Sequence, residues 1–401
     1  MLLYIETKDQ SSCCGCRACE QICHKNAITM VSNEEGFLYP EIDMKLCVSC
    51  GACEKVCPQM TPPSKTEPIA IYAVQHNNAD ILSDSSSGGA FRLIADEVIA
   101  EGGCVAGCVL DEELRPVFKI ADSSDDLLPM QGSKYLSSNT LDVYAQVKER
   151  LTAGQLVLFT GAPCQCAGLV NYLGKSYKNL LTAEFLCHGM PSQAVFDIYI
   201  SHLIRKYRIK NGKSAIKNYR FRDKTKRGWG LVSSCTFVKG KSLKVKYTFE
   251  STDPYVYGFI NGYFNRYSCY SCKFRGKKRF TDFTFCDFWG VEKFHPEIDK
   301  TRGVSALSIN TQKAVAFKDN IADKANWIKT DAVSVSKCNA SLTEDGAEPV
   351  PVTRLTIYSL LKEKGWQIVA RKKLRPKRYF VKRAYYSLPT SIQKTIKRIL
   401  K

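Results

Sequence analysis

The 401-residue sequence lacks any apolar run approaching the ~20 residues that a membrane-spanning helix needs. Its first ten residues also lack the basic start and apolar core of a secretory signal. Because disulfides persist in oxidising compartments, these two absences argue against a disulfide framework for the 19 cysteines. They predict a cytoplasmic protein whose thiols are reduced and in part bind metal.

Acidic residues are also scarce, with 39 Asp and Glu against 58 Lys and Arg. Residues 354–401 hold fifteen basic residues and one acid, Glu363, which gives +14 of the total net charge of +19. Aromatic and aliphatic residues are interleaved there, a pattern that suits an anionic membrane surface at the inner face. Docking on the core or on an acidic ferredoxin explains the pattern equally well. Nucleic acid is disfavoured as a partner, because the core shows no helix-turn-helix or RNA-binding signature.

Eight cysteines in the first 57 residues form two copies of the spacing C-x2-C-x2-C-x3-C. In bacterial two-cluster ferredoxins of this spacing, the fourth cysteine of each run binds the other 4Fe-4S cluster. Zinc ribbons instead carry isolated C-x2-C pairs separated by longer loops. We therefore predict cluster one on Cys13, Cys16, Cys19 and Cys57, and cluster two on Cys47, Cys50, Cys53 and Cys23. Cys14 lies outside the pattern and is predicted to be a buried or idle thiol.

The fold class predicted is α+β or α/β in three parts. Residues 1–61 form a dicluster ferredoxin domain with a hairpin insertion, residues 69–345 a mixed α/β core, and residues 350–401 a basic helical tail broken at Pro376 and Pro389. In the core, apolar runs predict strands at 69–75, 104–110, 156–160, 180–186, 281–290 and 304–310. Helical periodicity predicts helices at 89–100, 141–151, 194–207 and 253–265, and another that follows the 156–160 strand and ends at residue 173. The 215–249 region is rich in strand signals, with a hairpin at 236–246.

Four further cysteines lie in the core at expected strand ends and loops: Cys164, Cys187, Cys269 and Cys272. Four thiols match the ligand count of another 4Fe-4S cluster and equally of an all-thiolate zinc site. The run Ser85–Gly89 leads directly into an expected helix. Such a run either binds a phosphate group or simply caps the helix.

The core resembles the coenzyme F-420 hydrogenase/dehydrogenase beta-subunit family, in the form with a fused N-terminal dicluster ferredoxin. The matching stretches are SSSGGAF (85–91), QGSKYLSS (131–138), FTGAPCQCAGL (159–169), FLCHGMPS (185–192), FRDKTKRGWG (221–230), CYSCKF (269–274) and DFTFCDFWG (282–290). The resemblance implies that the core binds FAD and a third 4Fe-4S cluster held by the four core cysteines. It also implies that Ser86, Ser87, Gly88, Gly89 and Lys134 contact the FAD.

Departures from the family pattern leave the fourth ligand of the third cluster open, because Cys166 and Cys286 are alternatives. His188, beside Cys187, is a candidate proton donor or a turn histidine packed near the cluster. The function predicted is an iron–sulfur flavoprotein oxidoreductase that passes electrons from a ferredoxin-type donor to FAD and on to a substrate. A sugar intermediate of polysaccharide synthesis is one candidate substrate. The alternative is an electron-relay subunit that serves a partner enzyme.

Overall fold

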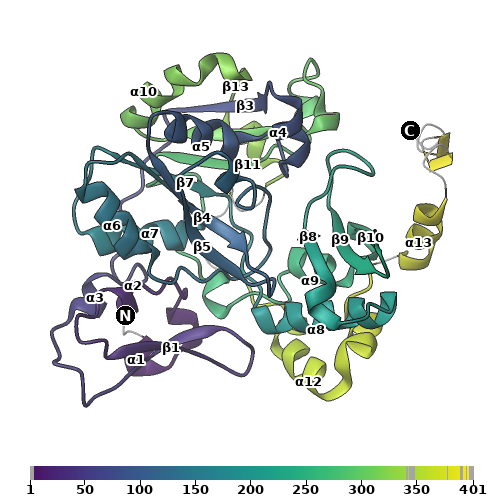
Figure 1. Ribbon diagram of the computed structural model, residues 1–401, viewed down its shortest axis with the longest axis horizontal. Coiled ribbons are helices and arrows are strands. Elements are labelled where there is room, and N and C mark those ends of the chain that lie inside the picture. The colour runs from purple at the N-terminus through teal and green to yellow at the C-terminus, as the bar shows by residue number, and fades with distance from the viewer. Residues whose placement is uncertain are drawn as a thin grey trace.

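The computed structural model describes residues 4–339, 342, 348–376, 378–388, 392–393 and 395–396. At the N-terminus, β1 (Ile28–Ser32) and β2 (Leu38–Ile42) pair antiparallel, which confirms the predicted hairpin. Three short helices accompany it: α1 (Tyr4–Thr7), α2 (Ala18–Gln21) and α3 (Ala52–Lys55). Figure 1 shows this unit in purple, at one corner of the core. No helix in the described part of the chain is long and apolar enough to cross a membrane.

The core is built on an eight-stranded sheet in the order β13-β3-β12-β11-β7-β6-β4-β5. The central strands β11, β7, β6 and β4 run parallel, and the flanking pairs are antiparallel, so the sheet is mixed. The strands are β3 (Ala70–His76), β4 (Cys104–Leu110), β5 (Pro116–Ala121), β6 (Val157–Gly161), β7 (Leu180–Phe185), β11 (Phe283–Asp287), β12 (Ser305–Ile309) and β13 (Ala325–Thr330). All six strands predicted for the core are confirmed, whereas β5 and β13 were not predicted.

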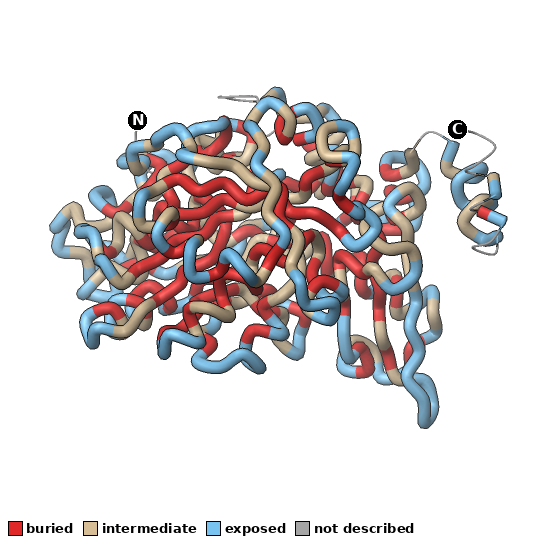
Figure 2. Tube along the Cα trace, turned by 90° about the horizontal axis from the view of Figure 1, so that it is seen from above, coloured by how far each residue is buried: buried red, intermediate tan, exposed pale blue. Residues whose placement is uncertain are grey.

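Alternation along the strands buries both faces of this sheet (Figure 2). On one face, Val105 and Leu158 pack with α5 (Ala90–Ala100) and α10 (Gln312–Asn320). On the other, Ala106 and Phe159 pack with α6 (Val143–Thr152) and α7 (Pro163–Leu173). Helix α4 (Ala79–Asp84) follows β3, and α11 (Ala332–Ser336) follows β13. The core is therefore a three-layer arrangement that presents the carboxyl ends of the parallel strands at one edge.

A second, antiparallel sheet of β8 (Ile216–Arg220), β9 (Val232–Lys239) and β10 (Ser242–Phe249) confirms the predicted strand-rich region and its hairpin. It packs with α8 (Gln193–Tyr207), α9 (Pro254–Ile260) and α12 (Val352–Lys373) around an aromatic cluster. The predicted helix at 253–265 is shorter than expected because it ends at Ile260, before Gly262 with its positive φ of 67°. Helix α13 (Tyr379–Ser387) lies beyond α12.

The first half of the basic tail is part of the folded core. Arg354 of α12 is 1% exposed, and its guanidinium pairs with Glu35 of the N-terminal hairpin loop, Nη1 to Oε1 at 2.8 Å. It also donates to the Asn265 carbonyl at 2.7 Å. A helical break that the sequence did not predict lies at Gly365, whose φ is 70°. The tail thus joins the chain's two ends through a buried ion pair.

Replacing Arg354 by methionine is expected to lower the free energy of unfolding by about 3 kcal/mol, because Glu35 would lose its buried partner. Anaerobic urea unfolding measures this, with the exposed Lys364→Met as the matched control. A midpoint unchanged from wild type would show that the pair does not hold α12 to the hairpin.

Candidate iron–sulfur and electron-transfer site

The two N-terminal cysteine runs repeat in backbone conformation as well as in sequence. Gly15 and Arg17 in the first run, and Ser49 and Gly51 in the second, all have positive φ, between 51° and 72°. Alternating left-handed residues turn successive N–H groups inward and form the concave nest that binds anions, including iron–sulfur clusters. The local backbone therefore suits a negatively charged cluster in both runs.

Backbone N–H groups donate to the cysteine sulfurs at matching positions of the two runs. Gly15 N–H donates to Cys13 Sγ, and Ser49 N–H donates to Cys47 Sγ, each at 3.4 Å. Hydrogen bonds to the sulfurs are one of the means by which a protein sets a cluster's potential.

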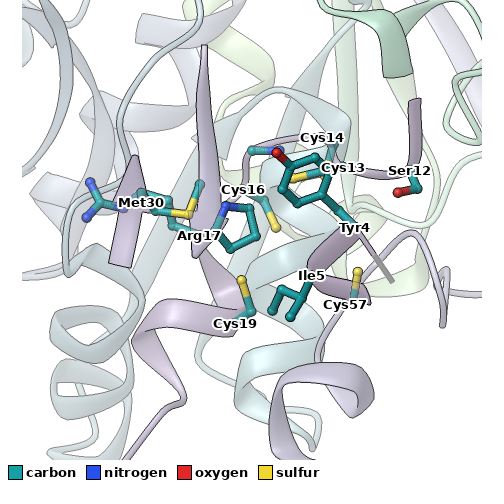
Figure 3. Close-up of a pocket in the computed structure, with 12 residues that line it drawn as sticks. Tyr4, Ile5, Ser12, Cys13, Cys14, Cys16, Arg17, Cys19, Met30 and Cys57 are labelled. Carbon is teal, nitrogen blue, oxygen red and sulfur yellow. The ribbon is translucent and has the colours of Figure 1, made fainter. Parts of the chain in front are cut away.

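The cysteines predicted for cluster one line a single cavity with about 420 Å³ of empty space, part of it open to solvent. Figure 3 shows Cys13, Cys16, Cys19 and Cys57 around it, with Tyr4 and Ile5 of α1 alongside. Burial raises the pKa of the Cys57 thiol to about 11, so the thiols must lose protons when iron binds. Four thiols around one space of this kind fit a 4Fe-4S cluster.

The cysteines predicted for cluster two lie nearer the surface. Cys50 is exposed, and Cys23, Cys47 and Cys53 are half-buried. Ala27 N–H donates to Cys23 Sγ at 3.3 Å. Within the described residues, no group of three or more His, Cys, Asp or Glu side chains is close enough to hold a single metal ion.

A buried cation from the core lies against cluster one. Arg266 is 1% exposed and donates to the Cys13 carbonyl at 2.7 Å, with Nη2 3.6 Å from Cys13 Sγ. Its guanidinium lies over the Tyr39 ring, 3.9 Å from the centroid. Its positive charge opposes the rise in the Cys13 pKa that burial causes. Sequence reasoning missed this residue, which lies 253 positions from Cys13.

The four core cysteines come together from three segments. Cys164 lies in the first turn of α7, Cys187 follows β7, and Cys269 and Cys272 lie at and after a 3-10 turn (Tyr267–Cys269). Burial raises the pKa of Cys187 to about 12, and the charge of Cys272 contributes to the rise. The charges of Cys187 and Cys272 also raise the pKa values of Cys269 and Cys164. Gly189 N–H donates to Cys187 Sγ at 3.4 Å, as at Cys13 and Cys47.

The alternative ligands lie elsewhere. The Cys166 thiol is fully buried and faces the Ala183 carbonyl at 3.9 Å. Cys286 lines a different cavity, and the charges that act on its pKa are those of Asp287 and Arg279. The arrangement therefore favours Cys164, Cys187, Cys269 and Cys272 as one ligand set.

Cys14, predicted to be a buried or idle thiol, lies between the two groups of cysteines. Its side chain hydrogen-bonds with Cys16 on one side and Cys164 on the other, and these bonds hold its pKa well below the usual value. Helix α7 approaches closely here because residue 168 is glycine. A Cβ at Gly168 would lie 3.1 Å from Cys16 Sγ and 2.9 Å from the Tyr144 hydroxyl.

The Ser/Gly loop predicted to contact FAD makes hydrogen bonds within the protein. Ser86 Oγ accepts from Ser133 N–H at 2.8 Å, and Ser87 Oγ donates to the Val304 carbonyl at 2.7 Å. A Cβ at Gly88 would lie 2.1 Å from the Val74 carbonyl oxygen, so this glycine permits packing of the loop on β3. The serine side chains of the loop are therefore engaged by the protein in this arrangement.

Lys134 is likewise engaged. Its ammonium donates to the carbonyls of Pro129 and Met130 at 2.9 and 2.7 Å, and burial lowers its pKa to about 8. The Ser86 and Ser87 hydroxyls and the Lys134 ammonium are thus bonded within the protein, and the contact of these residues with FAD stays a prediction.

An ion pair that the sequence analysis missed joins three of the family-like motifs. Arg222 pairs with Asp287 at 2.8 Å and also donates to the Ser86 carbonyl at 2.8 Å. Trp229 donates to Asp287 at 2.9 Å, and its ring stacks on Trp289 with centroids 4.4 Å apart. These residues come from the motifs FRDKTKRGWG, SSSGGAF and DFWG. The presence of all three motifs in one chain was the sequence signal that could have predicted their contact.

His188 follows Cys187 in the sequence and is exposed to solvent. The pKa of its imidazole is lowered by desolvation, and the nearby charge of Asp287 opposes this shift.

A second cavity, with about 390 Å³ of empty space, lies over β3, β12 and β11 and is covered by α11. Leu186, adjacent to Cys187, lines it together with Cys286 and Arg279. Arg279 is 2% exposed and pairs with Glu184 at 3.3 Å, and its Nε and Nη2 have no hydrogen-bond partner among the described residues. The cavity therefore combines an apolar wall with a buried cation beside the core cysteines.

Comparisons with known proteins agree with the two halves of the chain. Residues 12–60 match the 4Fe-4S dicluster domain, and residues 154–335 match the family that covers the C terminus of the coenzyme F420 hydrogenase/dehydrogenase beta subunit. Among solved structures, a chain of the F420-reducing [NiFe] hydrogenase complex from Methanosarcina barkeri is 14% identical, with a TM-score of 0.42, over 77% of this chain and 93% of that chain. No curated protein matches. Two parts of the chain are thus similar to these two domain families, in agreement with the motifs found in the sequence.

Proposed function

We propose that this protein is an iron–sulfur oxidoreductase that passes single electrons between a ferredoxin-type partner and its core. The proposed order is cluster two, cluster one, and then a core cluster held by Cys164, Cys187, Cys269 and Cys272. Cluster two has the exposed cysteine, Cys50, so it is the natural point of electron exchange with a partner. Cluster one lies deeper and faces the core.

The observation that carries this proposal is the close packing of α7, which bears Cys164, against Cys16. A relay needs its centres close together, and here the helix that bears a proposed ligand of the core cluster lies against a proposed ligand of cluster one. Gly168 permits this approach, because a Cβ at that position would lie 3.1 Å from Cys16 Sγ. The two halves of the protein are therefore packed where the two proposed clusters lie.

A flavin, which the family resemblance implies, would convert single electrons into pairs when bound. The residues predicted to contact it are engaged in protein hydrogen bonds, so we assign no step to it. Within the core, the chain holds the four cysteines half-buried and donates Gly189 N–H to Cys187 Sγ. These features suit a bound cluster.

Anaerobic protein with a complete relay is expected to contain about twelve irons per chain. Replacing Cys272 by alanine is expected to lower this to about eight, because a 4Fe-4S cluster needs four ligands. The exposed Cys338→Ala is the matched control and is expected to keep all the iron. About eight irons in wild type, unchanged by Cys272→Ala, would show that the core holds no cluster.

The electron acceptor divides the proposal into two forms. In the first form the protein is an enzyme with its own small substrate, and the cavity lined by Leu186 and Arg279 is the candidate place for it. The alternative is a relay subunit that serves a partner enzyme. Turnover of a small molecule by the chain alone with dithionite supports the first form. Activity present only in a purified heteromeric complex supports the second.

A further inference from the structure

Helix α13 lies beside the β9–β10 hairpin at one end of the molecule (Figure 1). Helix α13 is anchored at the base of β10. The Phe249 and Tyr386 rings stack with centroids 4.8 Å apart, and the Arg227 guanidinium lies 4.3 Å from each ring centroid. The Ser251 and Tyr386 hydroxyls are hydrogen-bonded at 3.0 Å. The helix therefore has a defined place beside the hairpin.

Large apolar side chains of α13 and the hairpin are open to solvent. Phe380 and Val381 of α13 are 66% and 67% exposed, and Leu243 of β10 is 62% exposed. Exposed apolar groups that recur within one surface mark an interaction site more often than singly scattered ones do.

The charges around these apolar residues are almost all positive. The exposed basic residues near them are Lys239 and Lys241 at the hairpin turn, and Arg378, Lys382 and Arg383 on and beside α13. Lys244 and Lys246 alternate with Leu243 along β10, so they point to the opposite face of the sheet. Lysines on an edge strand such as β10 also discourage strand pairing between molecules. That role does not account for exposed Leu243 between them or for the bare Phe380 and Val381 on a helix.

We propose that this surface, defined by α13 and the β9–β10 hairpin, binds an anionic lipid bilayer. Lysine and arginine side chains are attracted to anionic headgroups, and Phe380, Val381 and Leu243 enter the interface between headgroups and acyl chains. A nucleic acid would use the positive charge but would leave the aliphatic side chains in water. The combination therefore favours lipid over nucleic acid.

The test is co-sedimentation of the anaerobically purified full-length protein with vesicles of phosphatidylglycerol and phosphatidylcholine, and with phosphatidylcholine alone. Binding is expected only to the anionic vesicles and is expected to weaken as salt screens the charges. Two double variants, Phe380→Ser with Val381→Ser and Lys382→Glu with Arg383→Glu, are each expected to lower the partition coefficient about tenfold or more, because each removes one of the two contributions.

Matched controls lie outside the surface. Val333→Ser, at an exposed apolar residue of α11, and Lys178→Glu, at an exposed lysine, are expected to bind as wild type does. Thermal unfolding confirms that every variant is folded. Equal binding by Phe380→Ser with Val381→Ser and wild type would overturn the proposal, because it would reduce the surface to a general polyanion binder. Tighter binding to double-stranded DNA than to anionic vesicles would also overturn it.

Discussion

Replacing Arg266 by glutamine is expected to lower the midpoint potential of cluster one by on the order of 100 mV. The guanidinium lies 3.6 Å from Cys13 Sγ and is almost fully buried, so water screens it little. Reduction adds a negative charge to the cluster, and a nearby cation stabilises that charge. Two unit charges about 6 Å apart, at an effective dielectric constant of about 20, interact by about 3 kcal/mol. For one electron, that energy corresponds to the shift given.

Redox titration followed by electron paramagnetic resonance measures this shift. Arg266→Lys keeps the positive charge but loses the stacking on Tyr39. The midpoint potential of cluster one in this variant is expected to stay close to that of wild type. Cluster two is the internal control, and its midpoint potential should equal that of wild type. A potential equal to wild type in Arg266→Gln, with the iron content intact, would show that Arg266 holds the backbone of Cys13 and does not tune the cluster.

Replacing Gly168 by leucine is expected to uncouple the dicluster domain from the core. A Cβ there already meets Cys16 Sγ at 3.1 Å, and a leucine side chain needs space that α7 and Tyr144 occupy. Overpacking of this kind costs about 1–3 kcal/mol. The dicluster domain would have to move away from α7, which lengthens the path between Cys16 and Cys164 and slows electron transfer between the two clusters.

The measurement is rapid mixing with dithionite, followed by freeze-quench spectroscopy of each cluster. Ala100→Leu, at an exposed position of α5, introduces the same side chain where there is space and serves as the control. The iron content of Gly168→Leu should equal that of wild type, since no ligand is changed. If both clusters were reduced as fast as in wild type, electrons would reach the core by another path.

The cysteine runs could be recognised in the sequence because most of the predicted ligands of each cluster lie close together along the chain. Spacing of two and three residues determines which thiols can face one cubane, and short-range sterics place Gly15 and Gly51 in the left-handed region. The central strands could be predicted because both faces are buried, which makes them continuous apolar runs. Strands β5 and β13 lie at the sheet edges, where burial is partial and the apolar pattern is correspondingly weak.

The Ser/Gly loop shows where local reasoning met its limit. Serines and glycines before a helix suit a phosphate group, and they suit packing against a neighbouring strand equally well. The contacts of Gly88 with Val74 and of Ser87 with Val304 show how the loop packs, and its phosphate-binding role stays a prediction. The same holds for Lys134, whose ammonium is turned towards backbone carbonyls of the preceding turn.

By itself, the sequence determined the dicluster domain, because its cysteines follow a short, fixed spacing, and it indicated the similarity of residues 154–335 to the beta-subunit family through its motifs. The tertiary structure alone decided that Arg266 approaches Cys13, that Cys14 reaches Cys164, and that Arg354 holds the tail to Glu35. Each of these contacts joins segments more than a hundred residues apart. Such pairings depend on how the sheet, α7 and α12 pack, and no local pattern of residues encodes that packing.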